Sequence, residues 1–574
     1  MILPPLDAVA VEDLRRAALR FGDKHRVHKS AALAACASRA LSDPAVLLAY
    51  HDCLLCLLAY PETRALLAAA RAELKRVAKA ARAIVAAGPA RARATLANTG
   101  LAWTPMTINF GWDIARWLVE RFPRRAEIDS FGDDGVALQA TLATALPAIE
   151  FELAAAPESS SDFLDRASAG RTGSRLAWLV RVFLRLPAND ALREHLFDGL
   201  QAFIAIAPGA SMLSRTVVRG LPAPIFFHRE PLQRQVDPRT LVDLPMPARR
   251  RLSPREQWRV VDAGRAMLAA LGRETDAIAA AHRNGVAWFD VERGVALALY
   301  TTRPDRRSPI DSHIGMMLFK NGVPVGYGGG WPFLGTCRIG VNIFSPFRGG
   351  ESAYLFAQVL RVYRQQFAIG RFVAEPSQFG GTDTEGLRSG AFWFYYRLGF
   401  RPIDRTAARL ASEEWSRIAA DPGYRTPLPS LRRFTASDIE LRLNDVPDCE
   451  PSVLSDAVTR WIGRRFHGDR TAAERAAMRQ VVRALGAADH DRWPDGERRA
   501  LCALAPLVAQ IPGLFRWPQA DKRALIALIR AKGADEFRFH DRLARHGRLR
   551  DALVELAGGS DPPTRGTRPN RHVE

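Results

Sequence analysis

The first 220 residues carry apolar side chains at intervals of three and four. In the stretch "LLAYPETRALLAAARAELKRVAKAARAIVAAG", leucine, alanine and valine recur at this spacing. It is the period of one helix face, and it predicts helices that end at Gly and Pro. In "TINFGWDIARWLVERF" the same spacing puts Ile114, Trp117 and Leu118 on one face and predicts another helix. Because no fixed repeat length runs through this region, we expect an irregular helical domain.

Six prolines interrupt residues 221–252, and few runs there are compatible with a helix. This composition predicts a linker or an extended segment that wraps a neighbour. The next residues give a clear helix start. Ser253 can cap the helix, Pro254 takes its first position, and Glu256 can return a hydrogen bond to the cap.

Beyond that helix the period changes from that of helices to that of strands. The runs "VAWFDV", "GVALALY" and "TCRIGVNIF" are rich in β-branched and aromatic residues. Asn321-Gly322 lies between two further apolar runs and predicts a tight hairpin. A helix to about Ala368, the strand "RFVAEP" and a helix "GLRSGAFWFYYRL" ending at Gly399 follow. This order predicts a mixed sheet with helices on both faces over residues 253–425.

From about Ala436 the helical period returns, as in "DKRALIALIRAKG". We therefore expect a helical C-terminal region over 426–558. Residues 559–574, "GSDPPTRGTRPNRHVE", are polar and rich in Pro and Gly, and they predict a disordered tail. The expected fold class is α/β, mostly helical overall, with a central mixed sheet.

Composition adds a size and a charge to this picture. The chain has 574 residues, 48% hydrophobic and 25% charged, which is enough for roughly three to four domains. Its formal net charge is +20, and only seven of its 81 basic residues are lysines. So strong an arginine bias is typical of a compositional preference, although the charge would attract polyanions without specificity. Because neither a helix-turn-helix nor an aromatic-basic RNA motif is found, we expect no specific nucleic acid partner.

The sequence shows neither a secretory signal nor an apolar run long enough to cross a bilayer. We therefore expect a cytoplasmic protein with no membrane partner. Six cysteines in this length give no disulfide framework. Cys53 and Cys56 form a CxxC inside an apolar helical stretch without a second ligand pair, so we expect core packing there and no metal site.

The segment most informative about chemistry is the turn Arg348-Gly349-Gly350-Glu351-Ser352-Ala353. It lies between a predicted strand and a predicted helix, so backbone N–H groups without partners should face outward at the helix N-terminus. These groups and the helix dipole favour an anion. Glycine at 349 and 350 allows close approach of the backbone to a ligand.

Residues from about Ile314 to Ile403 resemble the GNAT superfamily of N-acetyltransferases, and with the upstream helix and strands we expect the GNAT-like domain to extend over 253–425. The matching features are the hairpin "MMLFKNGVPVGYGGG", the strand "RIGVNIF", the turn "RGGESA" and the helix "AFWFYYRLGFRP". In that family an Arg/Gln-x-x-Gly-x-Gly/Ala turn binds the pyrophosphate of acyl-CoA, and a strand splayed from its neighbour holds the pantetheine arm. The resemblance implies acetyl-CoA or another acyl-CoA as co-substrate. It assigns the binding of this co-substrate to Val341, Asn342, Ile343, Phe344, Arg348, Gly349, Gly350, Ser352, Ala353 and Arg388.

The resemblance also implies catalytic roles. Tyr395, four residues before Gly399-Phe400, stands where the family's tyrosine protonates the departing thiolate; Tyr396 would serve if the register slips. A base must take a proton from the amine. His313 is the first choice because its unperturbed pKa suits the task, and Glu375 and Asp311 are further candidates.

Two residues depart from the family pattern. Glu351 replaces the central glycine of the phosphate turn, and Arg388 falls where asparagine is frequent. A carboxylate at a helix N-terminus is favourable to the dipole, by about 0.3–1 kcal/mol, and would repel a pyrophosphate unless it points away.

The predicted function is therefore acyl-CoA-dependent N-acyltransfer to an unidentified amine, on a small molecule or a protein. The helical flanks would recognise the acceptor or hold a protein partner. Trp331 and Phe333 are candidates for lining the acceptor pocket or, equally, for packing within their loop. The alternative is a non-catalytic interaction protein in which the GNAT-like domain is only a scaffold.

Overall fold

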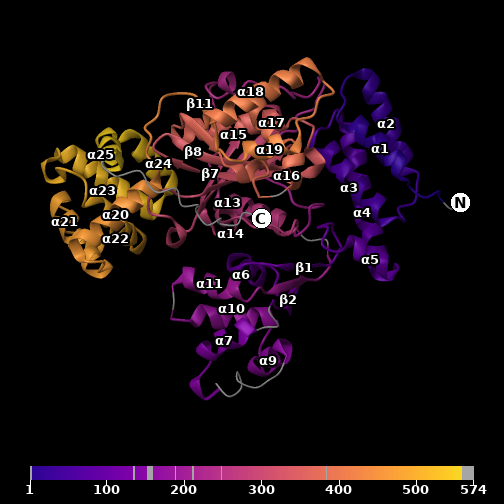
Figure 1. The fold of residues 1–574 in the computed structure, drawn as a ribbon. Helices are drawn as coiled ribbons and strands as arrows, with labels where there is room; N and C mark the ends of the chain where they lie inside the picture. Colours follow the sequence, from indigo (N-terminus) through magenta and orange to yellow (C-terminus); the bar gives the residue numbers. More distant parts are fainter. Residues whose placement is uncertain are drawn as a thin grey trace.

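A computed structural model describes residues 3–132, 136–150, 159–187, 189–209, 212–246, 248–382 and 384–558. Figure 1 shows a central sheet with helices packed around it, an N-terminal group of helices at one side, a C-terminal helical bundle at the other, and a small lobe below. The N-terminal group consists of α1 (Ala8–Ala18), α2 (Asp23–Ala37), α3 (Pro44–Ala59), α4 (Arg64–Ala87) and α5 (Ala90–Leu96).

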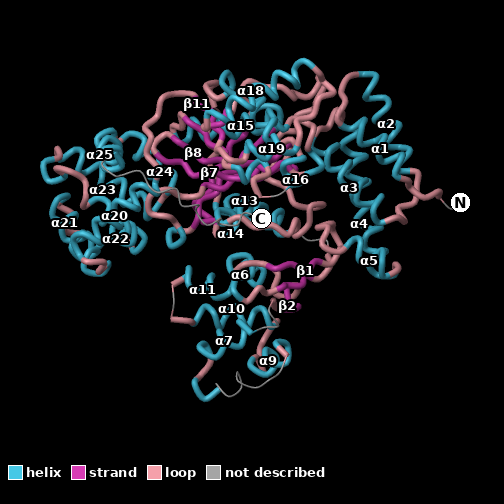
Figure 2. The backbone as a smooth tube through the Cα atoms, in the orientation of Figure 1, coloured by secondary structure: helices cyan, strands magenta, loops and turns pink. Residues whose placement is uncertain are grey.

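The small lobe contains strands that the helical prediction for residues 1–220 missed. Its three-stranded antiparallel sheet has the order β1-β3-β2, and Figure 2 shows two of these strands in magenta among the lobe's helices. The lobe's elements are β1 (Met106–Asn109), α6 (Trp112–Arg121), β2 (Ala126–Ser130), α7 (Val136–Ala145), α9 (Ser160–Ala167), α10 (Arg175–Arg185), α11 (Asp190–Gly199) and β3 (Phe203–Ile206).

The central sheet has eight strands in the order β10-β11-β9-β8-β7-β6-β5-β4. Every neighbouring pair is antiparallel except β8 with β9, which is parallel. This is the mixed α/β sheet flanked by helices that the sequence predicts. The strands are β4 (Ala281–Asp290), β5 (Val295–Thr302), β6 (Ile314–Lys320), β7 (Val323–Phe333), β8 (Thr336–Ile343), β9 (Arg371–Ala374), β10 (Arg401–Pro402) and β11 (Ile439–Arg442).

Helices cover both faces of this sheet. They are α12 (Pro238–Leu241), α13 (Pro254–Ala269), α14 (Asp276–Ala279), α15 (Ser352–Phe367), α16 (Thr384–Arg388), α17 (Ala391–Arg397), α18 (Arg405–Ala420) and α19 (Leu428–Phe434). The predicted helix after β9 is in fact two helices, α16 and α17, divided at Gly390, whose φ of 78° is left-handed.

Two local signals in the sequence are confirmed. Asn321 and Gly322 have φ of 49° and 77° and join β6 to β7 in the expected tight hairpin. Ser253 and Glu256 form the predicted capping box at the start of α13. Helix α15 ends with its C-cap Ala368, as expected, and this residue has a left-handed backbone with φ of 54°.

The glycines of the central strands show which helix lies on which face. A Cβ at Gly315 of β6 would touch Ala277 of α14 at 2.8 Å, whereas one at Gly330 of β7 would touch Tyr363 of α15 at 3.0 Å. Gly315 pairs with Gly329, and neighbours along a strand point to opposite faces. Therefore α14 and α15 pack on opposite faces of the sheet.

The C-terminal helices form a separate bundle. It contains α20 (Pro451–Phe466), α21 (Arg470–Leu485), α22 (Asp495–Val508), α23 (Gln519–Ala534), α24 (Glu536–Arg545) and α25 (Gly547–Gly558). The expectation of helix from Ala436 onward is wrong at β11, which inserts between β9 and β10 and so belongs to the central sheet. The predicted disordered tail, 559–574, lies outside the described residues. None of the described helices has the length and hydrophobicity needed to cross a membrane.

Two apolar cores hold these parts. One is continuous from the N-terminal helices through the small lobe to the central sheet. It includes Cys53 and Cys56, as the sequence predicts for this pair. The other lies within the C-terminal bundle and is joined by Phe333 and Leu334 from the β7–β8 turn.

Candidate functional site

The site begins at the edge of β8. Residues 336–338 of β8 pair with β9, and the pairing between these two strands stops at Arg338. On the edge that faces β9, the described strands provide no partner for residues 339–343. Backbone N–H and C=O groups of β8 therefore face the widening between two parallel strands. Among the residues assigned to acyl-CoA, Val341 and Asn342 on this segment are partly exposed, whereas Ile343 and Phe344 are buried.

The diverging edge leads directly into the glycine turn. Arg348 is exposed, and its Nε donates to the carbonyl oxygen of Ile343 at 3.0 Å. Gly349 is exposed with φ of 79°, a position that favours glycine. Ser352 and Ala353, partly exposed, open α15, and the first N–H groups of a helix have no intrahelical acceptor.

Glu351 points away from this turn. Its carboxylate is fully buried, and it accepts from Lys320 Nζ at 2.7 Å and Arg293 Nη2 at 2.7 Å. The main-chain N–H of Gln233 donates to it at 3.2 Å. Burial, the largest single effect, would raise the pKa of this carboxyl, but the charge of Lys320 and the hydrogen bonds from Lys320, Gln233 and Arg293 together hold the pKa below its usual value. The negative charge at this departure from the family pattern is thus neutralised behind the turn.

Tyr395 of α17 faces the diverging edge of β8. Its side chain is 2% exposed, and its hydroxyl has no partner with hydrogen-bond geometry among the described residues, although the main-chain N–H of Val341 lies near enough to lower its pKa slightly. Burial raises the pKa of Tyr395 well above its usual value, which keeps the hydroxyl protonated at neutral pH. Tyr396 lies elsewhere, against Trp415 of α18 and the guanidinium of Arg401. Of the two tyrosines, only Tyr395 is placed at β8.

His313 lies on the other face of the sheet. Its ring stacks on Trp331 at 4.1 Å between centroids, and its Nε2 lies over Gly329, on the face that α14 covers. Burial lowers the pKa of His313 to about 4, although the charge of Asp276 opposes this. At neutral pH the ring is therefore neutral, but it is a weaker base than the unperturbed imidazole on which the sequence prediction relied. The α15 side, where Tyr395 packs on Phe356, is separated from it by the sheet.

Glu375 is engaged in an ion pair. Arg338 of β8 donates to Glu375 at 3.1 Å, to Asp438 at 3.0 Å and to Glu450 at 3.3 Å. The Glu375 carboxylate is therefore already engaged by Arg338.

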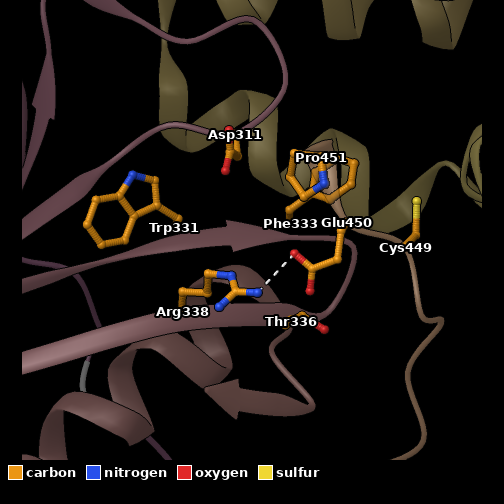
Figure 3. Close-up of a pocket in the computed structure, with 8 residues that line it drawn as sticks. All are labelled: Asp311, Trp331, Phe333, Thr336, Arg338, Cys449, Glu450 and Pro451. Carbon is orange, nitrogen blue, oxygen red and sulfur yellow. Dashed lines mark hydrogen bonds and ion pairs between the residues drawn. The ribbon is translucent and has the colours of Figure 1, made fainter. Parts of the chain in front are cut away.

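A small cavity opens beside the His313–Trp331 stack. Figure 3 shows Asp311 and Glu450 on two sides of it, Trp331 on a third, and the Arg338–Glu450 pair at its floor. Its volume is about 20 Å³, which is enough for one water-sized group. Asp311, the third candidate for the base, lines this cavity rather than the β8 edge.

Two further residues complete the placement. Arg388 of α16 is exposed, and no described contact joins it to the glycine turn. Gln378, which the sequence did not single out, covers Gly340 of β8 so closely that a Cβ there would collide with its amide. Glycine inside a strand marks a close approach of another group. Gly329 and Gly340 were therefore the features of the sequence that could have indicated the positions of His313 and Gln378.

Within the described residues no group of three or more His, Cys, Asp or Glu side chains is arranged to hold a metal ion. Comparisons with protein-family models, curated proteins and solved structures found no match to this chain. The functional argument therefore depends on the geometry of the site.

Proposed function

We propose that this protein transfers an acyl group, acetyl in the simplest case, from acyl-CoA to an amine. The observation that carries the proposal is the buried, unpartnered hydroxyl of Tyr395 beside the main-chain edge that β8 exposes where it diverges from β9. A buried polar group without a hydrogen bond costs about 1–3 kcal/mol. This cost is recovered if a bound ligand supplies the hydrogen-bond partner of the Tyr395 hydroxyl.

The glycine turn supports the phosphate end of the same ligand. It follows the diverging edge of β8 directly and offers the N-terminus of α15, with Arg348 exposed beside it. An anion is favoured there by the free N–H groups and the helix dipole. Glu351, which would repel a pyrophosphate, has its charge bound to Lys320 and Arg293.

The proposed reaction uses the two faces of the sheet. The amine nitrogen attacks the thioester carbonyl carbon, a C–N bond forms and the C–S bond breaks. The departing thiolate takes the proton of Tyr395, and the proton of the nitrogen passes to His313 on the other face through water in the gap where β8 diverges from β9. The products are an amide and a free thiol. Trp331 and the cavity beside it would lie on the acceptor side, next to His313.

Release of free thiol from acetyl-CoA tests this proposal, with polyamines and lysine-containing peptides as acceptors. Tyr395→Phe should lower the rate about 100-fold, within the range for loss of a general acid. Tyr396→Phe is the matched control and should stay within threefold of the wild type, because its ring faces α18. Equal rates for the wild type and Tyr395→Phe would remove this residue from the mechanism.

The alternative, a non-catalytic scaffold, makes the opposite prediction for ligand binding. Tyr395 and Gln378 occupy the space where β8 diverges, and in a scaffold this packing would be permanent. Acetyl-CoA would then neither bind nor raise the melting temperature.

A further inference from the structure

The positive charge of the N-terminal helices is concentrated in one segment. Residues 64–96, which form α4 and α5, contain eight Lys and Arg residues and one acidic residue. The remainder of residues 1–100 is balanced, with seven basic and seven acidic residues. The net positive charge of the first 100 residues therefore comes from α4 and α5 alone.

Most of these cations are free to meet a partner. Glu73, the acidic residue, is bound by Arg76 at 2.7 Å and by the hydroxyl of Tyr50 at 2.7 Å. The other seven basic residues are exposed, and within the described chain none is in an ion pair; Arg82 lies over the ring of Trp103, 4.4 Å from its centroid. The seven are Arg64, Arg71, Lys75, Lys79, Arg82, Arg91 and Arg93. This contrasts with the central sheet, where Arg338 alone contacts three carboxylates.

Five of the seven form a line along α4. At 100° per residue, Arg64, Arg71, Lys75, Lys79 and Arg82 lie within about 80° of one another around the helix axis and extend over about 27 Å. The opposite face of α4 is buried in the N-terminal core through Leu67, Leu74 and Val77. Figure 1 shows α4 and α5 at the side of the molecule away from the sheet.

The chemistry around the line distinguishes among polyanions. Alanines such as Ala68, Ala72 and Ala83 are exposed beside the cations, so a partner's backbone can approach closely. No large apolar side chain of 64–96 is among the exposed ones, so nothing is available to enter a bilayer or to anchor a protein interface. No Phe, Tyr or Trp lies in the segment either, which excludes base stacking by it.

From these observations we infer that the exposed face of α4 and α5 binds the phosphodiester backbone of a duplex nucleic acid, without reading its base sequence. A row of arginines and lysines can pair with the backbone phosphates, which gives affinity without sequence preference. The segment 64–96 itself contains no aromatic side chain for stacking on bases, so we expect no recognition of base sequence by it. This inference is independent of the proposed acyltransfer. It assigns to the N-terminal helices the recruitment of the protein to a nucleic acid.

The test is the salt dependence of binding to a mixed-sequence DNA duplex and to an RNA duplex of the same length. The variant Arg71→Gln, Lys75→Gln, Lys79→Gln removes three cations and keeps good helix formers. The wild type should bind both duplexes with an affinity that falls steeply with salt. The variant should bind at least tenfold more weakly at low salt, with a log–log slope reduced by about 3.

The matched control is Arg475→Gln, Arg479→Gln, Arg483→Gln, on the exposed face of α21 in the C-terminal bundle. It lowers the net charge by the same amount, and it should leave the slope within one unit of the wild type. Unchanged melting temperatures would confirm that both variants are folded. Equal losses from both variants, absence of duplex binding by the wild type, or tighter binding to phosphatidylserine vesicles than to either duplex would overturn the inference.

Discussion

Lys320 and Glu351 form a fully buried ion pair behind the glycine turn, and both side chains are inaccessible to solvent. Burial lowers the pKa of Lys320 to about 8, while Glu351 raises it. A buried ion pair is weak evidence of net stabilisation, but removal of one partner leaves an uncompensated charge. The ion pair therefore fixes the direction in which the Glu351 side chain points, away from the glycine turn.

Lys320→Met should destabilise the protein by about 3–5 kcal/mol, because the Glu351 carboxylate would stay buried with Arg293 as its one remaining charged partner among the described residues. Urea unfolding measures this loss. The double variant Lys320→Met, Glu351→Gln removes both charges and should recover more than half of the loss. A single variant as stable as the wild type would show that Glu351 is not held as a buried anion.

At the scale of elements, the N-terminus of α6 binds two carboxylates from other parts of the chain. Asp198 accepts from the N–H of Trp112 at 3.0 Å, and Glu274, between α13 and α14, accepts from the N–H of Gly111 at 2.9 Å. Burial raises the pKa of Asp198 to about 6 and that of Glu274 to about 8, and the charge of Asp198 adds to the rise at Glu274. This contact joins the small lobe to the central domain.

The junction should weaken as pH rises. A carboxyl whose folded pKa is raised binds more protons in the folded state than in the unfolded state between pH 4.5 and 8, so stability falls with pH across that window. Glu274→Gln should remove most of this dependence above pH 6, where Asp198 no longer contributes, and be more stable than the wild type at pH 8.5, by on the order of 1–2 kcal/mol after solvent screening. Unfolding midpoints at pH 5.5 and 8.5 measure it. Parallel shifts of both proteins would contradict the assignment.

The elements that the sequence predicted are those with strong local signals. The hairpin at Asn321-Gly322 and the helix start at Ser253 depend on residues a few positions apart, and both are as expected. The missed strands β1, β3 and β11 have only four residues each, which gives a period of two little to show; β9 is as short, but the sequence predicted it from the run "RFVAEP". They exist because distant strands pair with them.

In the candidate site, too, some features follow from the local sequence and others depend on residues far away in the chain. The turn and Tyr395 follow from local sequence, and the structure places both beside β8. The direction of Glu351 depends on Lys320 and Arg293, 31 and 58 residues away. The separation of His313 from Tyr395 by the sheet depends on the register of β6, β7 and β8. No local pattern contains this information.

At the scale of the whole molecule, both helical flanks contact loops of the candidate site. On one side Cys56 Sγ of α3 donates to the carbonyl oxygen of Pro346 at 2.7 Å, next to the glycine turn. On the other, Lys532 of α23 donates to Ser312 Oγ at 2.8 Å, beside His313. The flanks therefore support the turn and the loop that carries the candidate base. A ligand that orders the site should stabilise all three parts.

Calorimetric titration of the intact protein with acetyl-CoA tests the central claim most directly. We expect one site per chain, weakened at least fivefold by Arg348→Gln, which removes the exposed cation of the glycine turn, and little changed by Arg388→Gln, which lies on α16 without a described contact to that turn. The melting temperature should rise with acetyl-CoA concentration. No heat of binding and no melting shift at millimolar acetyl-CoA would contradict the account, and the central domain would then be a scaffold.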